Sequence, residues 1–465
     1  NIVFILADDL GYGDLSSYGS STIRTPNIDQ IAQNGIKFTD FYAASPVCTP
    51  SRAAFLTGRY PSRLGIKHVF MGDSMDGMPL AEITLAEQLK TAGYDTGMVG
   101  KWHLGHLDRY MPWNQGFDEF YGVPYSNDIA NFFFYENQTI LYEDINQRYL
   151  TQRYTHKALD FIERHQDKPF FLYIAHSMPH TPLYASPNFE GKSDNGLYAD
   201  VVEELDWSIG QVTQKLTELG LSDNTIVVFT SDNGPWLSMK DHAGSAGILR
   251  DGKQVTFDGG QRVPTVIQWP KVIAPNREHH GIANMMDWFV TFSDIADVPL
   301  PTNTVIDGQN ISAVLNGSGQ RQDQSFFYMS SISSQPVAYR EGDWKLKLAR
   351  KGYPRFLDYV LKINFYYHGE LLFNLANDPE EQHNLAKQYP ERVEQMREKI
   401  TRFDAELANE NVRPLYMSAK KADHSDFNIM IKSVAIVVIP LLALLVLLLY
   451  GCYRGLKALI RRLKN

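Results

Sequence analysis

The chain has 465 residues, of which 44% are hydrophobic and 12% aromatic, so it can bury a large core and form two or more structural units. Its formal net charge of −9 argues against a basic surface, and we expect no nucleic-acid partner. The two cysteines, Cys48 and Cys452, lie far apart in the sequence and provide no disulfide framework, so Cys48 needs an explanation of its own.

Over the first two thirds of the chain, apolar segments typical of buried strands alternate with amphipathic segments typical of helices. The predicted strands cover residues 1–9, 96–101, 169–176 and 224–234. The predicted helices cover residues 25–35, 83–94, 149–165 and 202–220. This alternation predicts an α/β fold in which helices flank a large mixed, mostly parallel sheet. In such a sheet, functional side chains collect at the carboxyl ends of the strands.

The pattern changes near residue 335, and this change sets the predicted boundaries. Residues 1–335 are predicted to form the main α/β domain. Residues 336–415 contain hairpin-like segments and one helical segment, which predicts a smaller α+β subdomain with an antiparallel sheet. Residues 416–432 would form a linker, and residues 451–465 a basic tail.

Residues 433–450 carry no charge and would span roughly 27 Å as a helix, close to the thickness of a bilayer's hydrocarbon core. They predict a C-terminal transmembrane helix, with a buried core helix as the alternative. More basic residues follow this segment than precede it, which favours a short cytoplasmic C-terminal tail. We therefore expect a membrane-anchored protein whose large domain is extracytoplasmic: lumenal, periplasmic or extracellular.

Polar pairs end two of the predicted strands. Asp8 and Asp9 follow the first strand, and Asp232 and Asn233 follow the strand over 224–234. Carboxylate and amide oxygens are the ligands that Ca²⁺ or Mg²⁺ prefers. Asp, Asn and Gly are also ordinary turn formers, and either pair alone would be read as a turn. Together, at strand ends of one sheet, the two pairs favour a metal site.

Cys48 precedes a segment predicted to begin a helix near Ser51, where backbone N–H groups and the helix dipole favour an anion. Arg52 lies one turn after Cys48 and can face the same way. A thiol here could be a nucleophile, which requires a histidine base and a lowered pKa. It could equally be a small buried hydrophobe. The spacing alone leaves both interpretations open.

Two longer motifs identify a family. The segment Cys48–Gly58, "CTPSRAAFLTG", resembles the first signature of the type I sulfatases, and Gly93–Gly105, "GYDTGMVGKWHLG", resembles the second. The resemblance runs to about Asn384 and is strongest to arylsulfatase and N-acetylgalactosamine-6-sulfatase types. It implies an alkaline phosphatase-like fold. It also implies that Cys48 is oxidised to Cα-formylglycine, whose hydrate is the nucleophile.

The resemblance further implies a metal site and a maturation partner. Asp8, Asp9, Asp232 and Asn233 would hold one divalent cation, usually Ca²⁺ with Mg²⁺ as the alternative, and the modified Cys48 would complete its ligands. A formylglycine-generating or equivalent enzyme would modify Cys48.

The same resemblance assigns the sulfate-binding and proton-transfer groups. Arg52 would orient the gem-diol, while Lys101 and His103 would lie beside formylglycine and sulfate. His180 and Lys253 would act on the bridging and free sulfate oxygens. His180, assisted by Lys253, would protonate the leaving group.

Ser126, in "GVPYSNDIA", matches a serine that contacts sulfate in arylsulfatase-like members. Asp232 is a candidate base for attack on sulfur. His103 would then take a proton from the second hydroxyl of the sulfo-enzyme intermediate, which expels sulfate.

The predicted function is hydrolysis of aryl or carbohydrate sulfate esters, with a sulfated small molecule or glycan as substrate. Two alternatives stay open. The first is a phosphatase or phosphodiesterase of the same superfamily. The second is a catalytically silent membrane protein that binds sulfated glycans.

Overall fold

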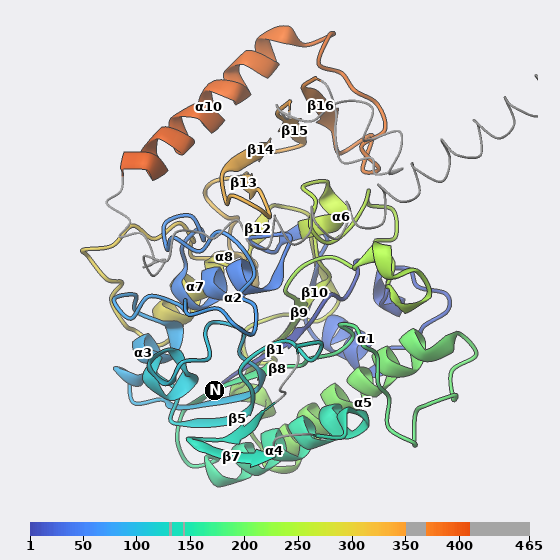
Figure 1. The fold of residues 1–465 in the computed structure, drawn as a ribbon, viewed down its shortest axis with the longest axis vertical. Helices are drawn as coiled ribbons and strands as arrows, with labels where there is room; N and C mark the ends of the chain where they lie inside the picture. Colours follow the sequence, from blue (N-terminus) through green and yellow to red (C-terminus); the bar gives the residue numbers. More distant parts are fainter. Residues whose placement is uncertain (130–132, 143–144, 350–368, 410–465) are drawn as a thin grey trace, which may run out of the picture. The chain divides into compact units, whose positions relative to one another are not determined.

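A mixed sheet organises most of the chain in the computed structural model, which describes residues 1–129, 133–142, 145–349 and 369–409 (Figure 1). Within these residues the sheet has ten strands, in the order β11-β2-β10-β9-β1-β8-β4-β5-β6-β7. In chain order the strands are β1 (Ile2–Ala7), β2 (Ile36–Phe38), β4 (Asp95–Lys101), β5 (Glu119–Val123), β6 (Phe134–Glu136), β7 (Thr139–Tyr142), β8 (Phe170–Ala175), β9 (Ile226–Ser231), β10 (Thr265–Gln268) and β11 (Arg277–His279).

The centre of this sheet is parallel. β1 pairs in parallel with both β8 and β9, and β4 pairs in parallel with β8 and β5. β10 is antiparallel to β2 and β9, and β6 is antiparallel to β5 and β7. The predicted mixed, mostly parallel sheet is therefore confirmed.

Helices cover both faces of the sheet, because alternate side chains of a strand point in opposite directions. In β1, Phe4 and Leu6 join one hydrophobic core with α2, α3 and α7, whereas Val3 and Ile5 join another with α1, α4 and α5. Figure 1 shows α4 and α5 side by side.

The α-helices are α1 (Pro26–Gln33), α2 (Cys48–Thr57), α3 (Leu85–Lys90), α4 (Leu150–Arg164), α5 (Gly196–Glu218), α6 (Asp258–Gln261), α7 (Asp287–Ile295), α8 (Ser312–Leu315) and α10 (Pro390–Asn409). Short 3-10 helices cover Ser16–Tyr18, Asp108–Tyr110, Pro112–Asn114, Gln147–Tyr149, Ser222–Asn224 and Leu237–His242.

The helix that carries the first signature starts earlier than predicted. α2 begins at Cys48 and ends before Gly58, which has a positive φ of 69°. A Cβ at Gly58 would lie 2.8 Å from Cβ of Phe289, so the turn packs closely against α7. Every residue of α2 is buried. Cys48 is thus the first residue of a helix that is buried along its whole length.

A smaller antiparallel sheet forms the C-terminal part of the described chain. Its strands are β13 (Ser325–Met329), β14 (Pro336–Glu341), β15 (Trp344–Lys347) and β16 (Leu371–Asn374), and α10 packs against β14 and β15. β3 (Phe41–Tyr42) and β12 (Ala283–Asn284) form a two-stranded parallel pair. The predicted antiparallel sheet and helix are therefore present, and the sheet already begins with β13, before the predicted boundary at residue 336.

One finding contradicts the predicted transmembrane helix and the predicted membrane-anchored location, and both predictions are wrong. Among the described residues, no helix is both long and apolar enough to cross a bilayer. The longest described helix, α5, carries charged side chains along its length, including Asp200, Glu204 and Lys215. Residues 433–450, on which the prediction depended, lie outside the described residues. The chain divides into two compact units, 1–415 and 416–465, and the second unit also lies wholly outside the described residues.

A buried charge cluster joins the small sheet to the main domain. Lys345, on β15, places Nζ 2.8 Å from an oxygen of Asp258 and 2.8 Å from an oxygen of Glu381. Tyr42 and Tyr328 donate hydroxyl hydrogen bonds to the two oxygens of Asp258. All three charged side chains are fully buried. Because Asp258 begins α6, this cluster anchors a segment of the main domain to the small sheet.

We expect Lys345→Met to lower the free energy of unfolding by about 3–5 kcal/mol, because it leaves two buried carboxylates without their shared cation. Urea denaturation followed by circular dichroism would measure the loss. Lys399→Met is the matched control, since Lys399 forms an exposed pair with Glu341 and should cost less than about 1 kcal/mol. Equal losses in the two variants would contradict this account.

Candidate active site

Two polar strand ends meet at one edge of the main sheet. Because β1 and β9 are parallel neighbours in register, Asp8 and Asp9 leave the sheet beside Asp232 and Asn233. The backbone N–H of Asp9 donates to Oδ1 of Asp232 over 3.2 Å. Nδ2 of Asn233 donates to Oδ1 of Asp9 over 2.7 Å. The structure therefore brings the four predicted metal-ligating residues together.

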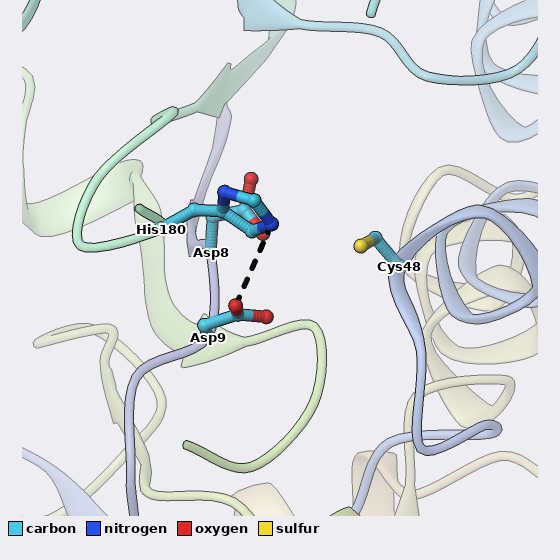
Figure 2. A group of neighbouring side chains, drawn as sticks. All are labelled: Asp8, Asp9, Cys48 and His180. Atoms are coloured by element: carbon cyan, nitrogen blue, oxygen red, sulfur yellow. Dashed lines mark ion pairs between the residues drawn. The ribbon is translucent and has the colours of Figure 1, made fainter. Parts of the chain in front are cut away.

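Cys48 faces this acidic cluster from the first residue of α2 (Figure 2). One ligand atom from each of Asp8, Asp9, Cys48 and His180 lies within 4.8 Å of the others. Cys48 is 2% exposed, and burial raises the pKa of its thiol to about 11. A thiol with that pKa is protonated at neutral pH and is a weak nucleophile. The environment does not activate an unmodified cysteine.

Arg52 lies one helical turn after Cys48 and is fully buried. Its Nε donates to Oδ2 of Asp232 over 2.9 Å, and its Nη2 lies 3.4 Å from Oδ2 of Asp8. Its Nη1 donates to the carbonyl oxygen of Lys101 over 2.7 Å. Burial lowers the pKa of Arg52, but the carboxylates, led by Asp232, outweigh it and raise the pKa. One charged guanidinium thus connects α2 to the ends of β1, β4 and β9.

Each of the two adjacent aspartates, Asp8 and Asp9, lies beside the ammonium group of one lysine. Nζ of Lys101, at the end of β4, lies 2.5 Å from Oδ2 of Asp8, and Nζ of Lys253 lies 2.8 Å from Oδ2 of Asp9. Burial raises the pKa of Asp8, but nearby charges, led by that of Lys101, outweigh it and leave the pKa below its ordinary value. At Asp9 burial dominates, and its pKa is raised.

His103 has one ring nitrogen bound and the other free of hydrogen bonds within the described residues. Nε2 lies 2.9 Å from the carbonyl oxygen of Phe70. A carbonyl oxygen only accepts, so Nε2 carries the hydrogen and the buried Nδ1 keeps its lone pair. Burial, reinforced by the charge of Lys101, holds the pKa of His103 well below its ordinary value. The ring is therefore neutral, with a free lone pair on Nδ1.

His180 and Ser126 complete the predicted set. Nδ1 of His180 donates to the carbonyl oxygen of Thr181, and Nε2 lies 3.7 Å from Oδ2 of Asp9. Burial lowers the pKa of His180 to about 3, and the charge of Lys253 adds to this effect. Oγ of Ser126 accepts from Nζ of Lys101 over 3.2 Å and lies 3.4 Å from Nδ1 of His180. Ser126 thus bridges a lysine and a histidine of the site.

The donor set fits a hard divalent cation. Oδ1 of Asp8 and Oδ1 of Asn233 are buried oxygens without a hydrogen-bond partner in the part of the chain that the structure describes. Buried polar atoms are normally paired, so such oxygens at one place suit an ion. Asp232 lies at the edge of this group, with its oxygens turned to Arg52 and to the backbone of Asp9.

Sequence reasoning missed two residues at the site. Oγ1 of Thr49 donates to the carbonyl oxygen of His103 over 2.9 Å and accepts from the backbone N–H of Phe70 over 3.2 Å, so it holds the His103 segment against α2. Trp236 packs beside Lys253 and His180. Thr49 directly follows Cys48, and Trp236 follows Asn233 after a glycine and a proline, so their proximity to predicted site residues was the available signal.

Comparisons with known proteins agree on one family. Residues 1–298 match the family described as Sulfatase, and residues 250–406 match the one described as N-sulphoglucosamine sulphohydrolase, C-terminal. Human arylsulfatase A is 37% identical over 83% of this chain and 83% of its own length. Canine N-acetylgalactosamine-6-sulfatase is 41% identical over 70% of this chain and 68% of its own length.

Solved structures give the same result. One, from work on glycosaminoglycan metabolism by Bacteroides thetaiotaomicron, is 30% identical, covers 87% of this chain and 99% of its own, and has a TM-score of 0.80. Another, solved in complex with a neocarrahexaose, is 29% identical, covers 87% of this chain and 92% of its own, and has a TM-score of 0.76.

We expect Ca²⁺ to raise the temperature of thermal unfolding, because a ligand at 100 times its Kd stabilises the folded state by about 2.7 kcal/mol. Differential scanning fluorimetry after chelation and re-addition of Ca²⁺ or Mg²⁺ would measure the shift. Asp9→Asn should reduce it, whereas Asp223→Asn, at an exposed position, should not. A protein that responds to neither ion would contradict the metal assignment.

Proposed function

The chain belongs to the sulfatase family and is a sulfuric ester hydrolase, and we propose that it acts through a Cα-formylglycine formed from Cys48 on aryl or carbohydrate O-sulfate esters. One observation carries the proposal. Cys48 lies enclosed within a cluster of fixed charges, yet burial keeps its own thiol protonated. A side chain in this position fits the precursor of a nucleophile better than a nucleophile. Its maturation requires a partner enzyme that oxidises Cys48.

The charges around Cys48 suit a sulfate ester. Arg52, Lys101 and Lys253 are buried cations, each within 4 Å of an aspartate oxygen. A sulfate ester is a monoanion, and its bridging oxygen gains further negative charge as the bond from sulfur to the leaving group breaks. Fixed cations stabilise that charge without having to reorganise. Ser126, bound to Lys101, adds a hydroxyl that can donate to a sulfate oxygen.

Formylglycine and a divalent ion would supply the chemistry that this chain's own side chains lack. As its hydrate, formylglycine would provide the hydroxyl that attacks sulfur. A cation held by Asp8, Asp9, Asp232 and Asn233 would add positive charge at the sulfate oxygens. Arg52 would keep the residue at position 48 oriented, because its guanidinium is locked by Asp232 and by the carbonyl oxygen of Lys101.

We assign His103 the role of removing the proton from the second hydroxyl of the formylglycine hydrate. The carbonyl oxygen of Phe70 holds the hydrogen on Nε2, so Nδ1 is ready to accept a proton. On the other side, His180 and Lys253 both approach Asp9 and would act on the bridging oxygen. The ammonium of Lys253 would offset the charge that develops there. The negative charge of a bound sulfate would raise the pKa of His180, and the ring, protonated from solvent, would deliver that proton to the leaving group.

We expect peptide mass spectrometry to find Cα-formylglycine at position 48, and hydrolysis of an aryl sulfate to scale with the modified fraction. Cys48→Ala should lose this activity by several orders of magnitude, because it removes the nucleophile. Phosphate monoesters are the control substrates. Fully modified protein that cleaved them but no sulfate ester would refute the proposed function and favour a phosphatase.

We expect His103→Ala to stop after about one turnover and to accumulate sulfated enzyme, because the second hydroxyl proton has no acceptor. Intact-mass spectrometry after rapid mixing with substrate would detect the adduct. His106→Ala, in the same loop, is the matched control and should turn over normally. Normal steady-state turnover by His103→Ala would contradict the assigned role.

A further inference from the structure

We propose that Trp236 forms the wall of a leaving-group subsite for a single neutral sugar ring, and so determines which sulfate esters this enzyme accepts. The inference rests on the proposed function, because it places the organic part of the substrate relative to the sulfate-binding residues. Trp236 follows Asp232 and Asn233 by only a few residues, beyond a glycine and a proline. The chain therefore brings an indole directly from the end of β9 to the edge of the site.

Trp236 contacts both residues assigned to the bridging oxygen. Nζ of Lys253 lies 4.5 Å from the centroid of the indole. The ring of His180 lies 5.4 Å from it, centroid to centroid, at 47°. The indole itself is only partly buried. A leaving group is covalently attached to the bridging oxygen, so its first ring must lie beside Trp236.

The space beside Trp236 matches one ring. A cavity of about 130 Å³ is lined by Trp236, Ser238, Asp251, Lys253 and Gln254, among others. Lys253 is shared between this cavity and the acidic cluster, so the two spaces adjoin. An apolar cavity of about 150 Å³ holds benzene, and a volume of this order accepts one six-membered ring. A fused polycyclic alcohol would have to extend beyond it.

The chemistry of the lining favours a sugar over a purely apolar ring. Ser238, Gln254 and Asp251, which carry polar side chains, line the cavity together with Trp236 and the aliphatic residues Leu237 and Val255. Sugar hydroxyls can pair with these groups, while the C–H face of the ring contacts the indole. The lining holds one carboxylate, Asp251, and one ammonium, Lys253; Nε of Arg250 lies 3.9 Å from the Asp251 carboxylate, and Lys253 is paired with Asp9, so these charges are already balanced within the protein. A lining whose charges are paired in this way suits a neutral ring better than a charged one such as a uronate.

The loop that carries these groups is held in an unusual backbone conformation. Asp251 and Gln254 have positive φ angles of 58° and 77°, on either side of Lys253. Such non-glycine residues persist where the surrounding structure holds them, and they cluster at functional sites. The backbone N–H of Gln254 donates to the carbonyl oxygen of Pro46 over 2.8 Å, and that of Lys253 to the carbonyl oxygen of Pro235 over 2.9 Å. These bonds fix the cavity wall to the segments that carry Cys48 and Trp236.

The test compares three sulfate esters on formylglycine-containing enzyme: glucose 3-sulfate, glucuronic acid 3-sulfate and ringless ethyl sulfate. Trp236→Ala should lower kcat/KM for glucose 3-sulfate about tenfold, mainly through KM, and that for ethyl sulfate less than about threefold. Trp236→Phe should keep most of the activity on the sugar. Asp251→Asn should raise kcat/KM for glucuronic acid 3-sulfate relative to glucose 3-sulfate.

Trp344→Phe, on β15 of the small sheet, is the control for replacing a partly buried tryptophan, and thermal unfolding would verify that every variant is folded. Equal losses by Trp236→Ala on glucose 3-sulfate and ethyl sulfate would overturn the inference, because they would mean that Trp236 only positions Lys253. An unchanged uronate preference in Asp251→Asn would overturn the selection of a neutral ring. A fully modified wild-type enzyme that hydrolysed no sulfate ester would overturn the proposed function and this inference together.

Discussion

The whole active site depends on burying three aspartates that are balanced by three cations. Asp8, Asp9 and Asp232 are almost completely excluded from solvent, and carboxylates are costly to bury alone. This cost is offset by ion pairs with one guanidinium, from α2, and with two ammonium groups, from β4 and from the loop before α6. Removing any one of these cations would leave an excess of buried negative charge. The same balance keeps positive charge where a sulfate anion would bind.

The buried helix α2 supplies both Cys48 and the guanidinium of that balance. Arg52 reaches Asp232, Asp8 and the carbonyl oxygen of Lys101 at once, from a helix whose residues are all buried. Cys48, one turn earlier, is then placed against the acidic cluster by the same helix. Position 48 and its orienting arginine are thus one structural unit.

The small C-terminal sheet contributes to the site through the segment that carries Lys253. Nη1 of Arg250 donates to the carbonyl oxygen of Glu381, and the backbone N–H of Asp258 donates to its carboxylate, each over 2.6 Å. The segment between Arg250 and Asp258 is therefore pinned at both ends by one residue after β16. This segment contains Lys253 and part of the lining of the cavity beside Trp236, so the C-terminal part of the fold holds the residues that we propose for substrate recognition.

The sequence by itself determined the sheet, the polar strand ends and the identity of position 48. Alternation of apolar and amphipathic segments predicts β1, β8 and β9, and the two signature motifs point to Cys48 and Lys101 because these are local patterns. The transmembrane helix predicted from the apolarity of residues 433–450 was contradicted, since no helix among the described residues could cross a bilayer. The same local reasoning also placed the start of α2 near Ser51, although the helix begins at Cys48.

Only the tertiary structure decided how the groups work together. The carbonyl oxygen of Phe70 sets the proton on His103, Ser126 bridges Lys101 to His180, and Trp236 meets Lys253. Each contact joins residues from separate elements, and no spacing along the chain specifies its distance or direction. Local sequence selects which residue types stand at the strand ends. The packing of α2, β1, β4 and β9 against one another decides which atoms face which.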